Sequence, residues 1–194
     1  MKTYQVITAA STYPVSLTEA KSHLKVDTTA DDTYIESIIK AATQLSEEYT
    51  NRFFIDTVIE QYASSFEELE TLFKSKVSSV AHVKYYDSDN SLQTLSASVY
   101  DAQLNYEPSQ IQLVDGQSFP DITKRNDAVL VRYTVGYGSA ASDVPEIIKQ
   151  AILLTIGNFY QNRNSVVIGR IATELPQNVK WLLDTYKVQI IGWQ

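Results

Sequence analysis

Residues that commonly carry chemistry are few in this sequence. There are two histidines, His23 and His82, and no cysteine among the 194 residues. Thiolate nucleophiles, disulfides and cysteine-ligated zinc are therefore excluded, as is a histidine-rich metal site within one chain. A histidine that acts as a general base needs an orienting partner and a pocket, and the sequence indicates neither. We interpret both histidines as structural or surface residues.

Acidic and glycine-rich segments are the other candidates for chemistry. Asp31 and Asp32 could form a metal or acid–base pair, but adjacent acids at a helix start typically stabilise its N-terminus. The run at residues 67–70 (Glu-Glu-Leu-Glu) is typical of a solvated face. The Gly-Tyr-Gly segment at residues 136–138 lacks the Gly-Lys-Ser/Thr pattern of a phosphate loop, so its glycines are predicted to permit a bend between a strand and a helix. These residues indicate no catalytic site, no metal site and no cofactor.

The composition is that of a soluble globular domain. Hydrophobic residues make up 44% of the chain and charged residues 20%, and the length falls within the size of one domain. No apolar run approaches the roughly 20 residues that span a bilayer, and the N-terminus leads into no signal-peptide stretch. We therefore expect a single domain over residues 1–194, with no membrane segment.

Charge and aromatic content bear on nucleic-acid binding. Residues 1–72 carry 5 Lys/Arg and 12 Asp/Glu, and their balance of −7 equals the net charge of the whole chain. Residues 147–194 carry 5 Lys/Arg and 2 Asp/Glu. Because phosphate binding needs a basic surface, the chain is not expected to bind nucleic acid through its net charge. Its 13 tyrosines could still stack bases. A small soluble ligand- or single-strand-binding α+β domain is therefore the alternative function.

Two helices are predicted near the N-terminus. Ser16 and Glu19 form a capping box in front of an apolar stripe, which predicts a helix over residues 16–26. Apolar residues then recur at three- and four-residue spacing over residues 31–51, which predicts a second helix. Asn51 is suited to a left-handed C-cap at its end.

Residues 57–135 are predicted to form a small, mostly antiparallel sheet. Apolar and polar residues alternate over residues 129–135. A strand at residues 80–86 runs into the turn-rich segment 87–90 and returns through residues 92–95, which is typical of a hairpin.

Two further helices are predicted at residues 144–162 and 176–186, followed by a C-terminal tail at residues 187–194. The first is apolar on most sides from Ile147 to Tyr160, and such a helix must be covered all round. One small domain covers part of it, so a neighbouring subunit is expected to cover the rest. The predicted fold class is α+β, a helical core of about four helices with an inserted small antiparallel β region.

The order helix, helix, sheet, helix, helix resembles that of the head-tail connector family of tailed bacteriophages, also called head-completion or neck adaptor proteins. The matching phrases are residues 14–27 (PVSLTEAKSHLKVD), the Asp31-Asp32 helix start, and residues 48–52 (EYTNR), 131–138 (VRYTVGYG), 144–154 (VPEIIKQAILL), 159–163 (FYQNR) and 175–176 (LP). The resemblance spans about residues 7–186. Asn51 and Asn90 stand where the family usually has Gly, and asparagine tolerates the left-handed backbone that such positions adopt.

The resemblance implies a structural adaptor without catalytic activity or cofactor. Copies would form a ring, typically twelvefold, under the portal and extend the channel through which DNA passes without specific binding. The implied partners are the chain itself, the portal protein, and a stopper or tail-completion protein below the ring. The implied location is the virion neck between capsid and tail, with the host cytoplasm during assembly.

Two segments are candidate partner-binding surfaces in such a ring. One is a loop rich in Val and Ile between two arginines, and the other is the tail, where an apolar end with a Trp suits an interface anchor. For the tail, packing on its own subunit is the alternative. The candidate residues are Arg163, Val166, Val167, Ile168 and Arg170 in the loop and Lys187, Ile190, Ile191 and Trp193 in the tail.

Overall fold

The computed structural model describes residues 3–69, 71–163 and 175–188. The chain divides into two compact units. The sheet unit comprises Met1–Ala10, Asn51–Tyr137 and Val188–Gln194, and the helical unit comprises Ser11–Thr50 and Gly138–Lys187. A single domain over residues 1–194 stays a prediction.

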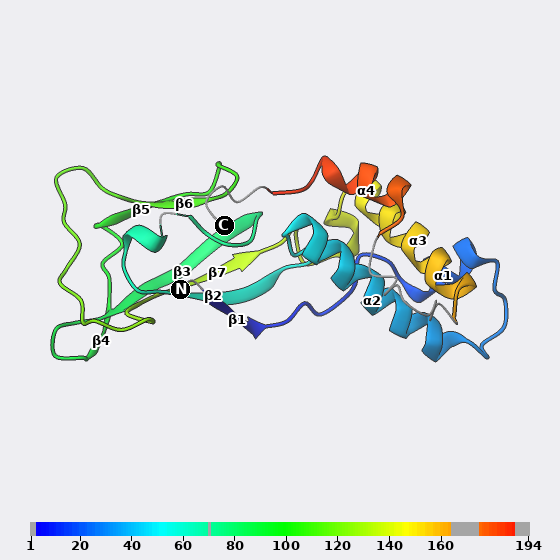
Figure 1. Ribbon diagram of the computed structural model, residues 1–194, viewed down its shortest axis with the longest axis horizontal. Coiled ribbons are helices and arrows are strands. Elements are labelled where there is room, and N and C mark those ends of the chain that lie inside the picture. The colour runs from blue at the N-terminus through cyan, green and yellow to red at the C-terminus, as the bar shows by residue number, and fades with distance from the viewer. Residues whose placement is uncertain (1–2, 70, 164–174, 189–194) are drawn as a thin grey trace, which may run out of the picture. The chain divides into compact units, whose positions relative to one another are not determined.

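The helical unit contains four α-helices in its described part. They are α1 (Leu17–Leu24), α2 (Asp32–Thr50), α3 (Glu146–Gln161) and α4 (Gln177–Asp184) (Figure 1). A short 3-10 turn, Ala141–Asp143, precedes α3. Each α-helix lies within the range that the apolar spacing and the end signals predicted for it.

The capping residues act as predicted. The Glu19 backbone N–H donates to the Ser16 hydroxyl at 3.2 Å, and the Ser16 backbone N–H donates to the Glu19 carboxylate at 2.8 Å. Hydrogen bonds from the Ser16 backbone and side chain hold the pKa of Glu19 below its usual value. Asn51 (φ 56°) and Asn90 (φ 58°) both adopt the left-handed conformation. Lys25 (φ 57°) does so as well, at the C-cap of α1, and the sequence did not indicate this.

Apolar side chains from all four helices form the core of the helical unit. The buried residues are Ala20 of α1, Ile35, Ile38, Ile39 and Ala42 of α2, Ile148, Ala151, Ile152 and Ile156 of α3, and Val179 and Leu183 of α4. Helix α3 contacts each of the other three. Its apolar surface is nevertheless not fully covered, because Ile147 is 45% exposed and Leu153 and Leu154 are only half-buried.

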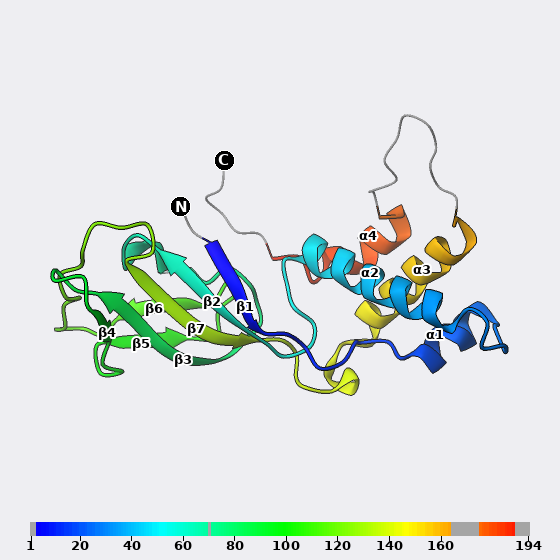
Figure 2. The ribbon, with the colours of Figure 1, turned by 90° about the horizontal axis from the view of Figure 1, so that it is seen from below.

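The sheet unit contains a five-stranded antiparallel sheet in the order β1-β2-β7-β3-β4. The strands are β1 (Thr3–Thr8), β2 (Thr57–Ala63), β3 (Val77–Tyr86), β4 (Leu92–Thr94) and β7 (Val129–Val135). Strands β5 (Tyr100–Gln103) and β6 (Gln110–Leu113) form a separate antiparallel pair. Figure 2 shows β7 running alongside β2. The predicted hairpin is β3–β4, and with the helices this sheet confirms the α+β prediction. Strand β1 was not predicted.

Inward-facing residues of β2, β3 and β7 form the core of the sheet unit. Ile59, Val83, Val131 and Tyr133 are fully buried there. The glycine at position 136 follows β7 with φ +150°, and a Cβ atom placed on it would lie 2.6 Å from the backbone nitrogen of Asp56. Glycine is therefore required at this bend, as the sequence predicted. In the part of the chain that is described, no helix is long and apolar enough to cross a membrane.

Candidate assembly surface

Arg163, one of the candidate contact residues, follows the C-terminal end of α3. Its guanidinium donates a hydrogen bond to Oδ2 of Asp31 at 2.8 Å and lies 4.4 and 4.6 Å from the ring centroids of Tyr34 and Tyr160. The Tyr160 hydroxyl donates to the same carboxylate oxygen at 2.5 Å. Cation–π contacts and charge-assisted hydrogen bonds both favour this arrangement. Arg163 therefore holds the end of α3 against the start of α2.

The acid in this cluster provides a direct test of the arrangement. The hydrogen bond from Arg163, and secondly that from Tyr160, hold the pKa of Asp31 below its usual value of 3.8. Because the folded-state pKa is depressed, the contact stabilises the fold above the unfolded-state pKa and is lost as the pH falls through the folded-state pKa. Arg163→Gln removes the larger cause, so the pKa of Asp31 should rise. An NMR titration of the side-chain carboxyl carbon measures it.

A matched control for this titration lies in the sheet unit. Arg125 forms an equivalent pair with Asp127, with two N–H···O distances of 2.6 Å. Arg125→Gln should raise the pKa of Asp127 and leave that of Asp31 unchanged. An Asp31 titration that is identical in the native chain and in Arg163→Gln would contradict the contact.

Lys187, the second described candidate, lies where α4 meets α2. Its ammonium group is 4.5 Å from the ring centroid of Tyr49. The Tyr49 hydroxyl donates to Asp184 at 2.5 Å, and this bond raises the pKa of the tyrosine. Both contacts attach the end of α4 to the C-terminal part of α2. Lys187 thus packs within its own helical unit.

The other seven candidate contact residues lie outside the described part of the chain. They are Val166, Val167, Ile168, Arg170, Ile190, Ile191 and Trp193. Their role in partner binding stays a prediction.

The most exposed large hydrophobic residue of the described chain was missed by sequence reasoning. Trp181 on α4 is 70% exposed, whereas Val179 and Leu183 of the same helix are buried. Its position gave a signal, because it falls outside the apolar stripe that passes through Val179, Leu183 and Tyr186. An aromatic residue off the core stripe suggests an interface rather than a core position.

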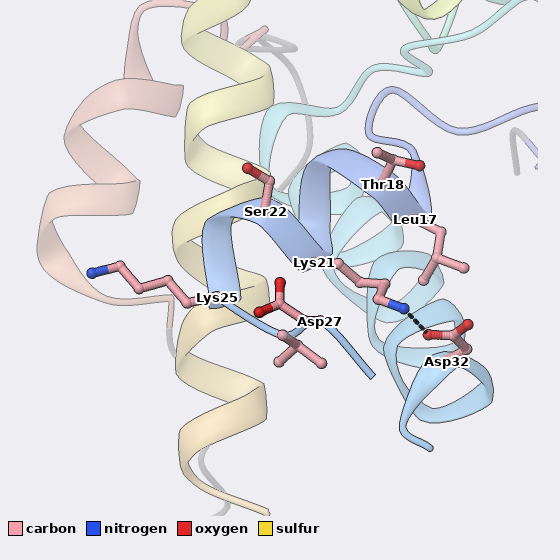
Figure 3. A pocket seen from close by; sticks show the side chains of 8 residues that line it. Leu17, Thr18, Lys21, Ser22, Lys25, Asp27 and Asp32 are labelled. Atoms are coloured by element: carbon pink, nitrogen blue, oxygen red, sulfur yellow. Dashed lines mark hydrogen bonds and ion pairs between the residues drawn. The ribbon is translucent and has the colours of Figure 1, made fainter. Parts of the chain in front are cut away.

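Two hollows flank α1. A cavity of about 700 Å³ is lined by residues of α1 and of the turn after it. Figure 3 shows the Lys21 ammonium directed at Asp32, at 2.6 Å, while Lys25 extends away from that pair. Because Lys21 and Asp32 neutralise each other, this cavity presents mixed polar groups rather than a charged site.

The second hollow, which we term the Tyr13 groove, has a volume of about 540 Å³. Tyr13 and Val15 line it from the segment that leads into α1, and Leu17 from the first turn of α1. Glu36, Ile39 and Lys40 line it from α2. Tyr13 is 42% exposed. The groove therefore combines four apolar or aromatic residues with four hydroxyl-bearing ones, one acid and one base, a mixed lining suited to a protruding amphipathic side chain from another protein.

The residues first considered for chemistry do not come together. His23 is exposed on α1, and burial lowers the pKa of His82 in β3, whose Nε2 lies 3.9 Å from Glu60. Asp31 and Asp32 bind Arg163 and Lys21, respectively. No group of three or more His, Cys, Asp or Glu side chains in the described chain is placed to hold a metal ion.

The family comparison classifies the chain. The model of a family described as phage gp6-like head-tail connector proteins matches residues 14–114, or 101 of the 194 residues. This chain belongs to that family. The match begins just before α1 and ends just after β6, so it includes most of the lining of the Tyr13 groove, although Tyr13 itself lies just before it. The match confirms the family that was inferred from the sequence segments.

Solved structures that share the fold of this connector come from gene transfer agent (GTA) particles. The neck of an empty GTA particle, computed with C6 symmetry, aligns with a TM-score of 0.78 and 19% identity. A chain of the native GTA virion aligns with a TM-score of 0.76 and 20% identity. A chain from the native GTA neck, computed with C12 symmetry, aligns with a TM-score of 0.75 and 19% identity. Each alignment covers 98% of this chain and 98% of the other. No curated protein sequence matches the connector.

Proposed function

We propose that this chain is a structural adaptor subunit in the neck of a tailed-phage-type particle. Copies form a ring under the portal, extend the DNA channel and join the head to the tail. The observation that carries the proposal is the match to the head-tail connector family over residues 14–114. The close likeness in fold to GTA neck chains, over nearly the full length of both, supports it.

The ring is most simply twelvefold. The two similar neck structures carry C6 and C12 symmetry, and a twelvefold ring contains a sixfold axis, so it agrees with both. A ring needs head-to-tail contacts, in which two different surfaces of each copy meet. The partly exposed side of α3, with Ile147 exposed and Leu154 half-buried one heptad later, is one apolar surface that a neighbouring copy can cover.

The adaptor acts through geometry rather than bond chemistry. Each contact between neighbouring copies can be weak, because a closed ring engages many identical contacts at once and raises the overall avidity. The partners are further copies, the portal protein, and a stopper or tail-completion protein. The net charge of −7 disfavours binding of the DNA that passes. The adaptor resides in the virion neck, and in the host cytoplasm during assembly.

Electron microscopy of the purified chain, alone and mixed with the portal protein of the same particle, tests the proposal. We expect a ring of copies in the mixture, stacked coaxially on the portal. A chain that remains monomeric beside the portal overturns the adaptor function. If that monomer binds single-stranded DNA in a salt-dependent manner, the alternative of a small binding domain takes its place.

A further inference from the structure

Trp181 has the surroundings of an interface anchor. The neighbours that share its face of α4, at spacings of three and four residues, are Gln177, Asn178, Asp184 and Thr185, and all four are exposed. A large aromatic side chain is thus surrounded by polar ones, which is the arrangement found at interaction hot spots. Exposure of 70% of an indole to water is unfavourable, so a partner that buries it gains free energy.

The Tyr13 groove can accept such a side chain. An aromatic residue buries about 150–250 Å² when it is covered, and a hollow of about 540 Å³ has room for an indole and its flanking atoms. The partly exposed side chain of Leu17 would contact the ring, with the nearly buried Val15 and Ile39 beneath it. The exposed ring of Tyr13 at the rim provides an aromatic surface on which an indole packs favourably.

Trp181 and the groove lie at opposite ends of α2. Helix α4 is attached near Tyr49 by the bond to Asp184, whereas the groove is lined by Glu36 and Lys40. Thirteen residues of helix separate Glu36 from Tyr49, a distance of roughly 20 Å. In Figures 1 and 2, α4 lies beside the end of α2 that leads toward β2, and α1 lies beside the other end. Two different surfaces at opposite ends of one unit are what a head-to-tail ring requires.

Charge also favours a second copy as the occupant. Residues 11–50, which carry the groove, contain 3 Lys and 7 Asp/Glu, a balance of −4. Residues 175–188, which carry Trp181, contain 2 Lys and 1 Asp, a balance of +1. The segment that carries the groove is thus acidic as a whole and the one that carries Trp181 is slightly basic, which favours the approach of one copy to the next over contact between two groove-bearing segments.

We propose that Trp181 of each copy inserts into the Tyr13 groove of the adjacent copy. This inference rests on the proposed ring and assigns it a specific contact. It also accounts for the exposed tryptophan on a helix whose opposite face is fully packed.

The absence of cysteine from the chain allows a clean cross-linking test. Trp181→Cys and Ser37→Cys place one thiol at the anchor and one at the groove wall. Rings of the double variant, either free or bound to the portal, are treated with a short bismaleimide and run on a denaturing gel. We expect a ladder of covalent oligomers up to the ring size. Each single variant should give no more than a trace of dimer, because its thiols do not face one another.

The strength of the contact is tested separately, because the cysteine replaces the anchor itself. Trp181→Ala should raise the protein concentration needed for half-assembly at least tenfold, and Trp181→Phe should raise it less. Tyr106→Ala, which removes an exposed aromatic residue of the sheet unit, is the control and should assemble normally. Circular dichroism checks that each variant is folded.

The outcomes separate the two proposals. If the native chain forms rings but the double variant gives no ladder and Trp181→Ala assembles normally, the Trp181 contact is wrong and the adaptor function stands. If Trp181→Ala forms rings but no longer binds the portal, the anchor belongs to the portal contact and the proposed contact between copies is overturned. If the native chain forms no ring even on the portal, both proposals fail.

Discussion

Removing residues 189–194 is expected to reduce the yield of joined, DNA-transferring particles at least about a hundredfold. The segment contains Ile190, Ile191 and Trp193, the proposed anchors on a neighbouring ring. A buried tryptophan anchor typically contributes about 2 kcal/mol or more, which is roughly 30-fold for one contact. Because a ring repeats each contact, the loss is multiplied over the copies. Counts of joined and unjoined heads in electron micrographs, together with the particle titre, measure the effect.

The structure decides where this truncation should begin. Lys187 lies over Tyr49, and Val188 is buried, so removal of these two residues would disturb the fold as well as any partner contact. Truncation after Val188 leaves both in place. The matched control is the double variant Gln189→Ala and Gln194→Ala, which changes only polar positions of the segment and should give native yields. Native yields from the truncated chain would rule out the tail as a partner contact.

Gln61→Leu is expected to lower the free energy of unfolding of the sheet unit by about 3 kcal/mol. Gln61 is fully buried in β2. Its carbonyl oxygen accepts hydrogen bonds from the Tyr133 hydroxyl at 2.7 Å and the Phe73 backbone N–H at 2.9 Å. Its amide donates to the Thr71 carbonyl at 3.3 Å. Leucine preserves the approximate size but takes the hydrogen-bond partner from the Tyr133 hydroxyl and the Thr71 carbonyl, and each such loss costs about 1–3 kcal/mol. The Phe73 N–H keeps the Tyr133 hydroxyl as an acceptor, at 3.2 Å.

Hydrogen exchange of the β2 and β7 amides measures this change, because it reports the opening of the sheet unit itself. Gln112→Leu, on an exposed position of β6, is the control and should change protection by no more than about 0.5 kcal/mol. Tyr133→Phe removes only the hydroxyl and should cost about 1 kcal/mol. Equal protection in Gln61→Leu and Gln112→Leu would show that the buried amide is not required.

The elements with strong local signals were predictable from the sequence. The capping box of Ser16 and Glu19 and the apolar spacing of α2 depend on residues within a few turns of each other, and both are confirmed. Strand β1 was missed because it is mostly exposed and shows no alternation. Its hydrogen bonds come from β2, where Thr3 pairs with Tyr62. Backbone hydrogen bonds between strands so far apart in the sequence do not change the pattern of side-chain types from which strands are predicted.

The candidate assembly surface was predictable only in part. Arg163 was singled out for its place beside an apolar loop, but its partner Asp31 is 132 residues away. Asp31 was interpreted as a helix-start residue, and it does precede α2, where its carbonyl accepts from the Ile35 N–H. The sequence did not show that its carboxylate also binds Arg163 and Tyr160 at the end of α3. Trp181 was not singled out, although its place off the apolar stripe of α4 was the available signal, because a large aromatic residue is usually assigned to the core.

Helix positions, the turns that need left-handed residues and the connector family follow from the amino-acid order, because each depends on spacing within short segments. The folded chain is needed to know which charged side chains neutralise one another and which aromatic residue remains exposed to water. Those outcomes depend on how distant segments pack. An apolar residue belongs to the core if another helix covers it and to a contact surface if none does. Whether it is covered depends on how the whole chain folds.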